Sequence, residues 1–399
     1  MKNTKNLLRF FARRNGQSKV DSATEPNLPH ITLIAAVSPW IPGAAAFHTH
    51  LAAALAAHSD LATISWKRLY PPLIYRGPSQ DDRLHLPAGL AVDYVLDCLN
   101  PLSWSRAYHR VKEHQSEVVI IPWLHPFFAP VSLYLLKRLR QQKRVILCHN
   151  VLPHEGFPLA RALTKRVFAE ADIIVVHAQS ELATLRRLGV DCPTVVAFHP
   201  RFVAADMAAK PNPKEIAVER SRRGDGVKLL CFGAVRPYKG VDLAIEALSR
   251  MNTPAHLLVA GRFWKDPAPL RALAEKLGVS ERVEFINEYV SDERAALLIA
   301  ASDLGLFPYR SATQSGAIQL VFAYGVPVVA TRVGGLSEAV REGVDGLLAQ
   351  PEATALAEAL DDAAARLAPL AAGVQPFRTE HSFDQYARLV LAAIAGTHK

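Results

Sequence analysis

The stretch VKLLCFGAVRPYKGVDLAIEALSR, residues 227–250, decides the fold of this chain. Its opening run is apolar, as in a buried parallel strand, and its closing residues repeat apolar side chains at helical spacing. The loop between them holds Gly233, Arg236, Lys239 and Gly240. Glycine lets the backbone approach an anion, a helix N-terminus offers unpaired amides, and the two cations add positive charge. The stretch therefore predicts a strand, a phosphate-binding loop and a helix.

The same alternation of apolar runs and helical segments continues on both sides of this stretch. In the C-terminal half the runs are residues 227–233, 255–261, 282–290, 304–309 and 326–331, and in the N-terminal half they are 31–37, 117–122, 144–150, 172–178 and 194–200. Such runs separated by helices are typical of parallel sheets with helices on both faces. The sequence thus predicts an α/β protein with two Rossmann-like domains and a cleft between them.

A composition shift marks the expected domain boundary. Residues 210–226 lack a continuous apolar run and carry two prolines, two glycines and many charges, which favours a linker. We therefore expect an N-terminal domain at 28–209 and a C-terminal domain at 227–375. Residues 1–27 form a separate basic segment, and residues 376–399 a C-terminal helix able to pack back on the N-terminal domain.

Charge and cysteine content narrow the class of protein. The formal net charge of +9 lies entirely in residues 1–200, which hold 23 Lys and Arg against 14 Asp and Glu, while residues 201–399 hold 23 of each kind. This asymmetry indicates an anionic partner, either a membrane leaflet or a phosphorylated substrate. Nucleic acid is not expected, because no nucleic-acid-binding module is present. Four scattered cysteines indicate neither a zinc site nor a disulfide framework and favour a reducing cytosol.

The first 19 residues allow two interpretations. Leu7, Leu8, Phe10 and Phe11 alternate with lysines and arginines, the composition of a helix that lies on an anionic membrane surface. A disordered basic tail has the same composition. Because no run of 18 apolar residues occurs, we expect a cytoplasmic protein that is soluble or peripheral on the inner face of the cell membrane.

A second cluster of candidate site residues lies between positions 308 and 340. Ser315 and Gly316 are placed to open a helix whose amides face a diphosphate, and Gln314 and Gln319 offer neutral hydrogen bonds. Further along, a buried strand leads into a glycine pair and then an acidic residue, at Gly334, Gly335 and Glu338. The sequence predicts a second loop at which a ligand approaches the backbone closely.

The motifs FGAVRPYKG, LLVAGRFW, VEFINEYVSDER, AASDLGLFPYRSATQSG, GVPVVATRVGG and EGVDGLL follow one another as in the retaining glycosyltransferases of family 4, also described as glycosyl transferases group 1. The chain resembles this family over about residues 30–390. The resemblance implies the GT-B fold, a C-terminal domain for a UDP- or GDP-sugar and an N-terminal domain for the acceptor. It also implies that no metal and no cofactor are needed, since basic side chains and amides hold the diphosphate.

By this resemblance Lys239 and Gly240 match the family's Lys-Gly pair, and Lys239 is the diphosphate lysine. The family's arginine falls at Ala234, so we expect Arg236 to substitute for it. The family's two glutamates fall at Ala312 and Leu320, which are not acidic. The chain is therefore identified as a variant with the sequence SATQSG, in which Ser315 and Gly316 contact phosphate and Gln314 or Gln319 takes over the polar contacts.

The resemblance also implies roles for residues outside these clusters. Gly43 and Ala44 match a glycine pair near the phosphates and the acceptor, and His48 matches a histidine that follows it. His149 matches a histidine near the transferred sugar, and it ends an apolar run, as do His177 and His199. Because the carboxyl ends of parallel strands share one edge, we expect these histidines to lie together facing the cleft. Asn287 marks the expected position of the base.

The expected reaction moves a sugar to a hydroxyl of a glycan or lipid-linked acceptor with retention. Arg236, Lys239 and helix-end amides stabilise the departing diphosphate electrostatically, and the acceptor attacks from the front face. Two alternatives stay open on the sequence alone. One is a nucleotide-sugar epimerase of the same fold, and the other is a non-catalytic nucleotide-sugar-binding protein, which the missing glutamates would allow.

Overall fold

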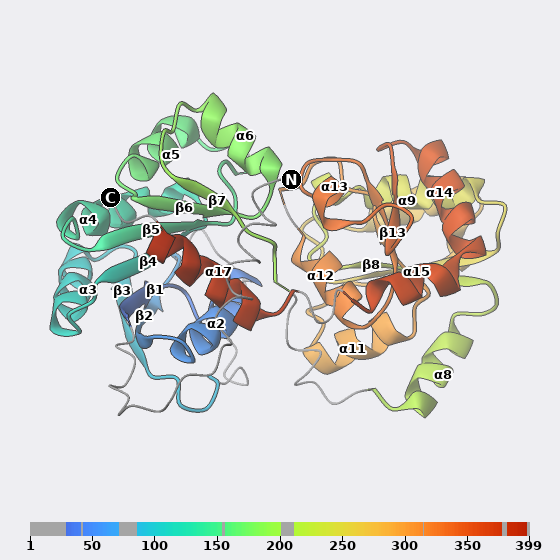
Figure 1. Ribbon diagram of the computed structural model, residues 1–399. Helices are drawn as coiled ribbons and strands as arrows, with labels where there is room; N and C mark the ends of the chain where they lie inside the picture. The colour runs from blue at the N-terminus through green and yellow to red at the C-terminus, as the bar shows by residue number, and fades with distance from the viewer. Residues whose placement is uncertain are drawn as a thin grey trace.

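Two parallel β-sheets, each with helices on both faces, form two domains that lie side by side (Figure 1). The structure is a computed structural model, and it describes residues 29–40, 43–71, 86–153, 156–200, 211–313, 315–376 and 381–396. The basic segment 1–27 lies outside these residues. Within the described chain, no helix combines the length and apolar character needed to cross a membrane.

The N-terminal domain contains a seven-stranded sheet in the order β3-β2-β1-β4-β5-β6-β7, with every pair parallel. Its strands are β1 (His30–Ile34), β2 (Asp60–Arg68), β3 (Val92–Asp97), β4 (Val118–Trp123), β5 (Lys143–Cys148), β6 (Ile173–Val176) and β7 (Thr194–Val196). Its helices are α2 (Gly43–Ala56), α3 (Pro101–Glu113), η1 (Pro126–Phe128), α4 (Ala129–Arg138), α5 (Ala160–Phe168) and α6 (Gln179–Arg187). The sheet order reverses direction beside β1, which is where ligands of such sheets bind.

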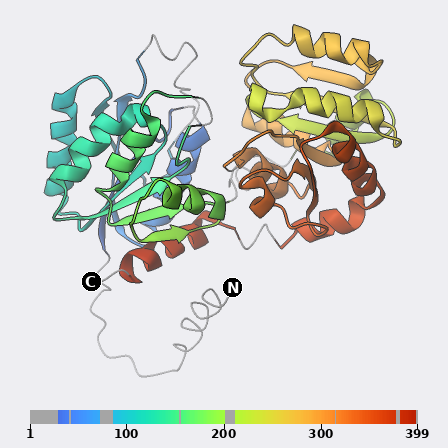
Figure 2. The same cartoon turned by 90° about the horizontal axis from the view of Figure 1, so that it is seen from above.

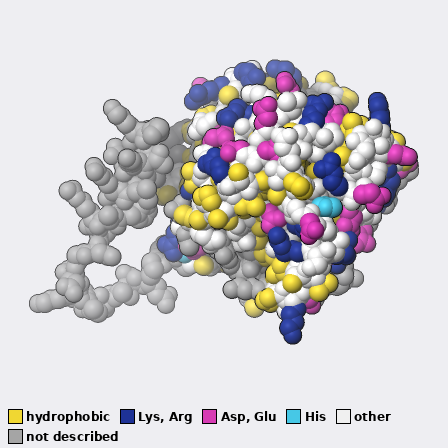
Figure 3. Space-filling view, turned by 90° about the vertical axis from the view of Figure 1, so that its right-hand side faces the viewer, with side chains coloured by type: hydrophobic (Ala, Val, Ile, Leu, Met, Phe, Trp, Pro, Cys, Tyr) yellow, Lys and Arg dark blue, Asp and Glu magenta, His cyan; other side chains and the backbone are white. Residues whose placement is uncertain are grey.

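The C-terminal domain repeats this plan with a six-stranded sheet in the order β10-β9-β8-β11-β12-β13. Its strands are β8 (Val227–Phe232), β9 (Ala255–Ala260), β10 (Val283–Ile286), β11 (Leu304–Phe307), β12 (Val328–Thr331) and β13 (Gly346–Ala349). Its helices are α8 (Pro213–Arg222), η2 (Pro237–Lys239), α9 (Val241–Arg250), α10 (Ala268–Lys276), η3 (Ser280–Arg282), α11 (Asp292–Ala300), α12 (Gly316–Ala323), α13 (Leu336–Ala339), α14 (Ala353–Ala365) and α15 (Leu367–Val374). The outer face of this domain mixes basic and acidic side chains (Figure 3).

Helix α17 (Phe383–Gly396) belongs to the N-terminal domain in space although it follows the C-terminal domain in sequence (Figures 1 and 2). It packs against α2, and its buried residues Phe383, Tyr386 and Val390 join one core with Ile31 and Leu33 of β1. Burying side chains of this size stabilises the fold by about 1.5–3 kcal/mol each. The chain therefore leaves the N-terminal domain after β7 and returns to it after α15.

The predicted segments differ from the structure at three strands and one helix. Strands β2, β3 and β13 are absent from the sequence prediction, because polar residues interrupt the first two and the third has only four residues. Within the expected linker 210–226, residues Pro213–Arg222 form helix α8. An Asn212 side chain caps this helix, and ion pairs from Arg220 to Asp303 and from Arg222 to Glu284 hold it on the domain. The cap and the ion pairs, and not an apolar run, therefore stabilise helix α8.

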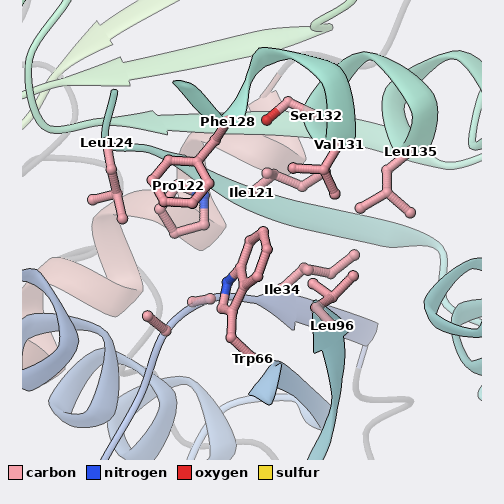
Figure 4. A pocket seen from close by; sticks show the side chains of 12 residues that line it. Ile34, Trp66, Leu96, Ile121, Pro122, Leu124, Phe128, Val131, Ser132 and Leu135 are labelled. Carbon is pink, nitrogen blue, oxygen red and sulfur yellow. The ribbon is translucent and has the colours of Figure 1, made fainter. Parts of the chain in front are cut away.

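A small apolar cavity lies inside the N-terminal domain, between the sheet and α4 (Figure 4). Side chains of Ile34, Trp66, Leu96 and Phe128 face one another across it, and its volume is about 20 Å³. One water molecule needs roughly 10–15 Å³ measured in this way. The cavity is therefore a gap in the packing and too small for a sugar or a lipid chain.

Candidate functional site

The carboxyl ends of the two sheets meet where the domains touch. Asn150 follows β5 and accepts a hydrogen bond from the Thr313 hydroxyl, which follows β11. Glu338 lies in α13, after β12, and its carboxylate accepts hydrogen bonds at 2.6 and 3.1 Å from the backbone amides of Gln179 and Ser180, at the start of α6. The loops that carry the predicted site residues of both domains thus face each other.

Lys239 lies in the loop between β8 and α9. Its Nζ atom lies 5.2 Å from the ring centroid of Tyr309, and a Cβ atom added to Gly233 would come within 3.1 Å of this Nζ. Among the residues that the structure describes, no carboxylate pairs with Lys239. Loss of hydration in the loop lowers the pKa of Lys239 below its ordinary value. A cation held in this way attracts an anion such as a phosphate.

Arg236 lies beside Lys239 and is stacked on an aromatic ring. Its guanidinium carbon lies 4.3 Å from the ring centroid of Trp264, whose surface is 59% exposed. Trp264 is fixed by a backbone hydrogen bond of 2.9 Å from its amide to the Val235 carbonyl. The Asn287 side chain accepts a hydrogen bond of 2.9 Å from the amide of Phe263, the preceding residue. Asn287, which the sequence places near the base, therefore holds the loop that orients Arg236.

Tyr309 connects the first cluster to the second. Its ring lies under Lys239, and its hydroxyl lies 3.4 Å from the Ser315 hydroxyl. Ser315 caps the N-terminus of α12, accepting a hydrogen bond from the Ile318 amide, and Gly316 is the first residue of that helix. The structure thus brings the Lys239 loop and the α12 N-terminus together around one ring. Tyr309 is not among the site residues predicted from the sequence, although it ends a predicted strand.

Gln314 of the SATQSG sequence and Gln319 of α12 have different outcomes. Gln314 lies outside the described residues. Gln319 is only 3% exposed and lies in the core side of α12, where its Oε1 atom has no hydrogen-bond partner among the described residues. Its amide group is therefore inside the domain and not at the surface of the loop.

The glycine pair makes its close approach to the protein's own backbone. A Cβ atom at Gly334 would lie 1.8 Å from the carbonyl oxygen of Ala312, and the Gly335 amide donates to the same oxygen at 3.2 Å. The pair thus locks the loop before Ser315 in position. Glu338 is predicted to contact the nucleotide-sugar donor. In the structure its carboxylate reaches across the domain boundary and contacts the first turn of α6.

In the N-terminal domain, His48 and His149 form a hydrogen-bonded pair. His48 lies on α2, which begins with Gly43 and Ala44, and its Nδ1 atom is 2.9 Å from the Ala36 carbonyl. Since that carbonyl only accepts, Nδ1 of His48 carries the proton, and Nε2 of a neutral His48 is an acceptor. The 2.9 Å contact between the two Nε2 atoms therefore makes His149 the donor. Neutral His149 then has an acceptor lone pair on Nδ1.

The strand-end histidines gather around Phe47, as the sequence predicts for His149, His177 and His199. The Phe47 ring centroid lies 4.9, 5.6 and 5.3 Å from theirs. His177 is also hydrogen-bonded at 2.8 Å to the hydroxyl of Tyr386 on α17. Phe47 and Tyr386 are not predicted from the sequence, because each has the spacing of an ordinary core residue on its helix.

Burial keeps these imidazoles neutral. It lowers the pKa of His48 and of His199 to about 4, and it lowers the pKa of His149 and His177 well below the ordinary value. The neighbouring imidazoles add to the shift of His149, because each disfavours a second positive charge nearby. At neutral pH the group is therefore a set of fixed hydrogen-bond donors and acceptors.

Comparison with known proteins gives a family match for the C-terminal domain. Residues 226–366 match the family described as Glycosyl transferases group 1. The D-inositol 3-phosphate glycosyltransferase of Corynebacterium efficiens is 32% identical over 226 residues, which are 52% of this chain and 52% of that protein. The chain spans about half the length of the curated relatives it matches.

Solved structures match over nearly the whole chain. Sucrose-phosphate synthase from Thermosynechococcus elongatus has a TM-score of 0.69 and 19% identity, covering 92% of this chain and 100% of the other. Anabaena HepE in complex with UDP has a TM-score of 0.70 and 17% identity, with coverages of 92% and 100%. The chain therefore has the GT-B fold, and its C-terminal domain matches the group 1 glycosyltransferase family in sequence.

Proposed function

We propose that this protein is a retaining glycosyltransferase of the family 4 type, which moves a sugar from a nucleotide diphosphate to a hydroxyl of an acceptor. The observation that supports the proposal is the pair of cations, Arg236 and Lys239, in the loop after β8, where Lys239 contacts the Tyr309 ring that also borders the α12 N-terminus. Lys239 has no described carboxylate partner, and Arg236 is held by Trp264. Both stand at the carboxyl end of the sheet that matches the group 1 family.

The chemistry of the step fits these groups. As the bond from the sugar to the diphosphate breaks, negative charge grows on the departing oxygen, and the sugar becomes electron-poor. Lys239, Arg236 and the first amides of α12 are fixed in advance and stabilise that charge. One such donor is worth about 3–4 kcal/mol in enzymes that stabilise an oxyanion in this manner. The proposed reaction needs no metal and no cofactor for this purpose.

His149 is proposed to contact the transferred sugar through Nδ1. The lone pair on this atom follows from the hydrogen bonds of the His48–His149 pair, and Asn150 beside it touches the Thr313 loop of the other domain. A neutral imidazole can accept a hydrogen bond from a sugar hydroxyl. Attack by the acceptor hydroxyl on the face that the diphosphate leaves, with its proton passing to the leaving phosphate, gives retention.

The donor is proposed to be a UDP-sugar, with a GDP-sugar as the second candidate. Support for UDP comes from Anabaena HepE, whose structure holds UDP, and support for transfer comes from the names of the curated relatives. The acceptor is proposed to be a glycan or a lipid-linked molecule in polysaccharide or glycoconjugate synthesis. The positive charge of the N-terminal half favours peripheral binding of the protein to the inner face of the cell membrane.

Titration calorimetry with UDP, GDP, ADP and their glucose or mannose conjugates tests the donor assignment. We expect tight binding of one nucleotide class and at least tenfold weaker binding in Lys239→Ala, because a desolvated charge-assisted contact is lost. The matched control is Lys276→Ala, an exposed lysine on α10. Unchanged affinity in Lys239→Ala would remove Lys239 from the donor site.

An acceptor panel then separates transfer from the two alternatives. A transferase releases free nucleotide from the bound donor faster when its acceptor is added. An epimerase converts the donor sugar with no acceptor present, and a binding protein releases no nucleotide with any acceptor. Co-sedimentation with anionic liposomes, with and without residues 1–19, tests the proposed membrane partner.

A further inference from the structure

Three side chains of types that bind metals lie at the amino ends of the strands of the N-terminal sheet. The contact with the other domain is at the opposite, carboxyl ends of these strands. His30 begins β1, Asp60 begins β2, and the two residues are paired in register. His114 is the C-cap residue of α3. One potential ligand atom of each residue lies within 4.8 Å of those of the other two. The three side chains come from segments far apart in the sequence and converge on one point.

The ring nitrogens of the two histidines do not form well-aligned, short hydrogen bonds within this group. His30 Nδ1 lies 3.0 Å from Asp60 Oδ2, yet among the described residues it has no hydrogen-bond partner of acceptable angle, and the atom is shielded from solvent. His114 Nε2 is 3.4 Å from the Asp60 carbonyl oxygen, and the two imidazole rings lie 5.7 Å apart at 59°. A buried ring nitrogen without an aligned partner loses the free energy of one hydrogen bond.

A bound cation would satisfy all three groups. Two ligand atoms about 2.1 Å from the same tetrahedral ion lie roughly 3.4 Å apart, so small rotations of these side chains suffice. Two imidazoles and one carboxylate are a ligand set that suits zinc, with a position left for water. The site is also reachable, because the side chains of His30 and Asp60 are 38% and 52% exposed.

The backbone that carries the group is held by hydrogen bonds. The Asp60 amide donates to the Pro29 carbonyl at 3.2 Å, and the Glu117 amide donates to the His30 carbonyl at 2.9 Å. The His114 amide donates to the Arg110 carbonyl at 3.0 Å within the last turn of α3. The backbone that carries the three side chains is therefore fixed before any ion arrives, which reduces the entropy lost on binding.

We propose that His30, Asp60 and His114 bind a zinc ion that ties the starts of β1 and β2 to the end of α3. The site stands apart from the proposed sugar transfer, which takes place at the carboxyl ends of the strands. Zinc binding to the folded chain alone raises its stability by mass action. Turnover at saturating substrates is unaffected by the ion.

The test uses the full chain without a polyhistidine tag, treated with a chelator and desalted. We expect calorimetry with zinc chloride to show one ion per chain, and the melting temperature to rise with zinc. His114→Gln and Asp60→Asn each weaken this binding at least tenfold. His109→Gln, an exposed histidine on the same helix α3, binds zinc as the natural chain does.

Circular dichroism without zinc shows whether each variant is folded like the natural chain. The proposal is overturned if the natural chain takes up no stoichiometric zinc at micromolar concentrations. It is equally overturned if folded His114→Gln and Asp60→Asn bind zinc with unchanged affinity. The zinc measurement is independent of sugar transfer, so failure of the proposed transferase function leaves it intact.

Discussion

Gly240 occupies a position that no other residue fits. Its φ of +64° is in the left-handed region, and a Cβ atom there would lie 2.0 Å from the Pro308 carbonyl oxygen. We expect Gly240→Ala to lower the free energy of unfolding, since it adds a backbone clash to the roughly 1–2 kcal/mol cost of the left-handed conformation. It also displaces the neighbouring Lys239 and weakens nucleotide binding. Urea unfolding and calorimetry measure the two effects.

Gly278 supplies the matched control for that substitution. Its φ of +69° is nearly the same, but a Cβ atom there would meet nothing within 4 Å. Gly278→Ala should therefore show only the conformational cost and leave nucleotide binding unchanged. Equal losses of stability in the two variants would mean that the Pro308 contact has no effect.

His48 should make the stability of the protein depend on acidity. It is neutral in the folded state, where burial lowers its pKa to about 4, whereas in the unfolded chain it ionises near the ordinary value of 6.5. Below pH 6.5 the unfolded state therefore binds more protons than the folded state, so acid favours unfolding. Above pH 6.5 His48 does not lower the free energy of unfolding. As the pH falls toward 4 it lowers this free energy progressively, by about 3 kcal/mol in total.

Urea unfolding at several pH values between 7.5 and 4 measures this contribution. The natural chain should lose stability more steeply than His48→Gln over this range. His109→Gln, which removes an exposed histidine, should follow the natural chain. Parallel pH dependence of the natural chain and His48→Gln would contradict a neutral buried His48.

The loop after β9 supports the loop that carries Arg236 and Lys239. The Arg236 guanidinium lies 4.3 Å from the ring centroid of Trp264. The residue before Trp264, Phe263, donates its backbone amide to the side chain of Asn287, which follows β10. A stack of this kind is worth about 0.5–1 kcal/mol at an exposed site. We expect Trp264→Ala to weaken nucleotide binding about two- to fivefold, without a matching loss of stability.

Trp264→Phe keeps an aromatic face and should retain most of the affinity. Calorimetry with the nucleotide that binds the natural chain, together with thermal unfolding, measures both quantities. If Trp264→Ala and Trp264→Phe weaken binding equally, the ring does not act by orienting Arg236.

At the level of elements, the sequence predicted the strands that are continuous apolar runs and missed those that are not. Strand β2 lies inside the sheet, yet it places Thr63 and Ser65 in the core, and the Ser65 hydroxyl accepts a hydrogen bond from the Val37 amide. Its polar residues therefore break the pattern that sequence reasoning seeks. Strands β3 and β13 stand at the sheet edges, where one neighbour and a short length suffice.

The candidate site shows a similar division. Lys239 lies in the local unit of β8, loop and α9, and Ser315 and Gly316 lie in the local unit of β11, loop and α12. Each motif was therefore enough to predict the local element that carries these residues. The contacts of Glu338 depend on the position of α6, which is 159 residues away from it along the chain at Gln179. The roles of Gly334 and Asn287 likewise depend on which backbone lies beside them. Sequence patterns carry no such long-range information.

On the scale of the whole molecule, Glu338 joins the two domains. Its carboxylate accepts hydrogen bonds from two backbone amides at the N-terminus of α6, where the helix dipole favours a negative charge. Hydrogen bonds to a charged group contribute about 1.5–3 kcal/mol. We expect Glu338→Gln to loosen the domain contact, with amide hydrogen exchange at Gln179 and Ser180 at least tenfold faster.

Hydrogen-exchange mass spectrometry of peptides that cover residues 177–183 measures this effect. Glu342→Gln is the control, because Glu342 pairs with Arg332 within the C-terminal domain. That variant should leave exchange at α6 unchanged. Natural rates at α6 in Glu338→Gln would show that the carboxylate does not hold the domains together.

The return of α17 to the N-terminal domain has a consequence for protein synthesis. The ribosome completes β1 to β7 long before it reaches Phe383, Tyr386 and Val390, which cover the face that includes Ile31 and Leu33. During this interval the nascent N-terminal domain exposes apolar surface, of the kind that chaperones recognise. The N-terminal domain therefore completes this core only after the C-terminal domain has been synthesised and has had the opportunity to fold.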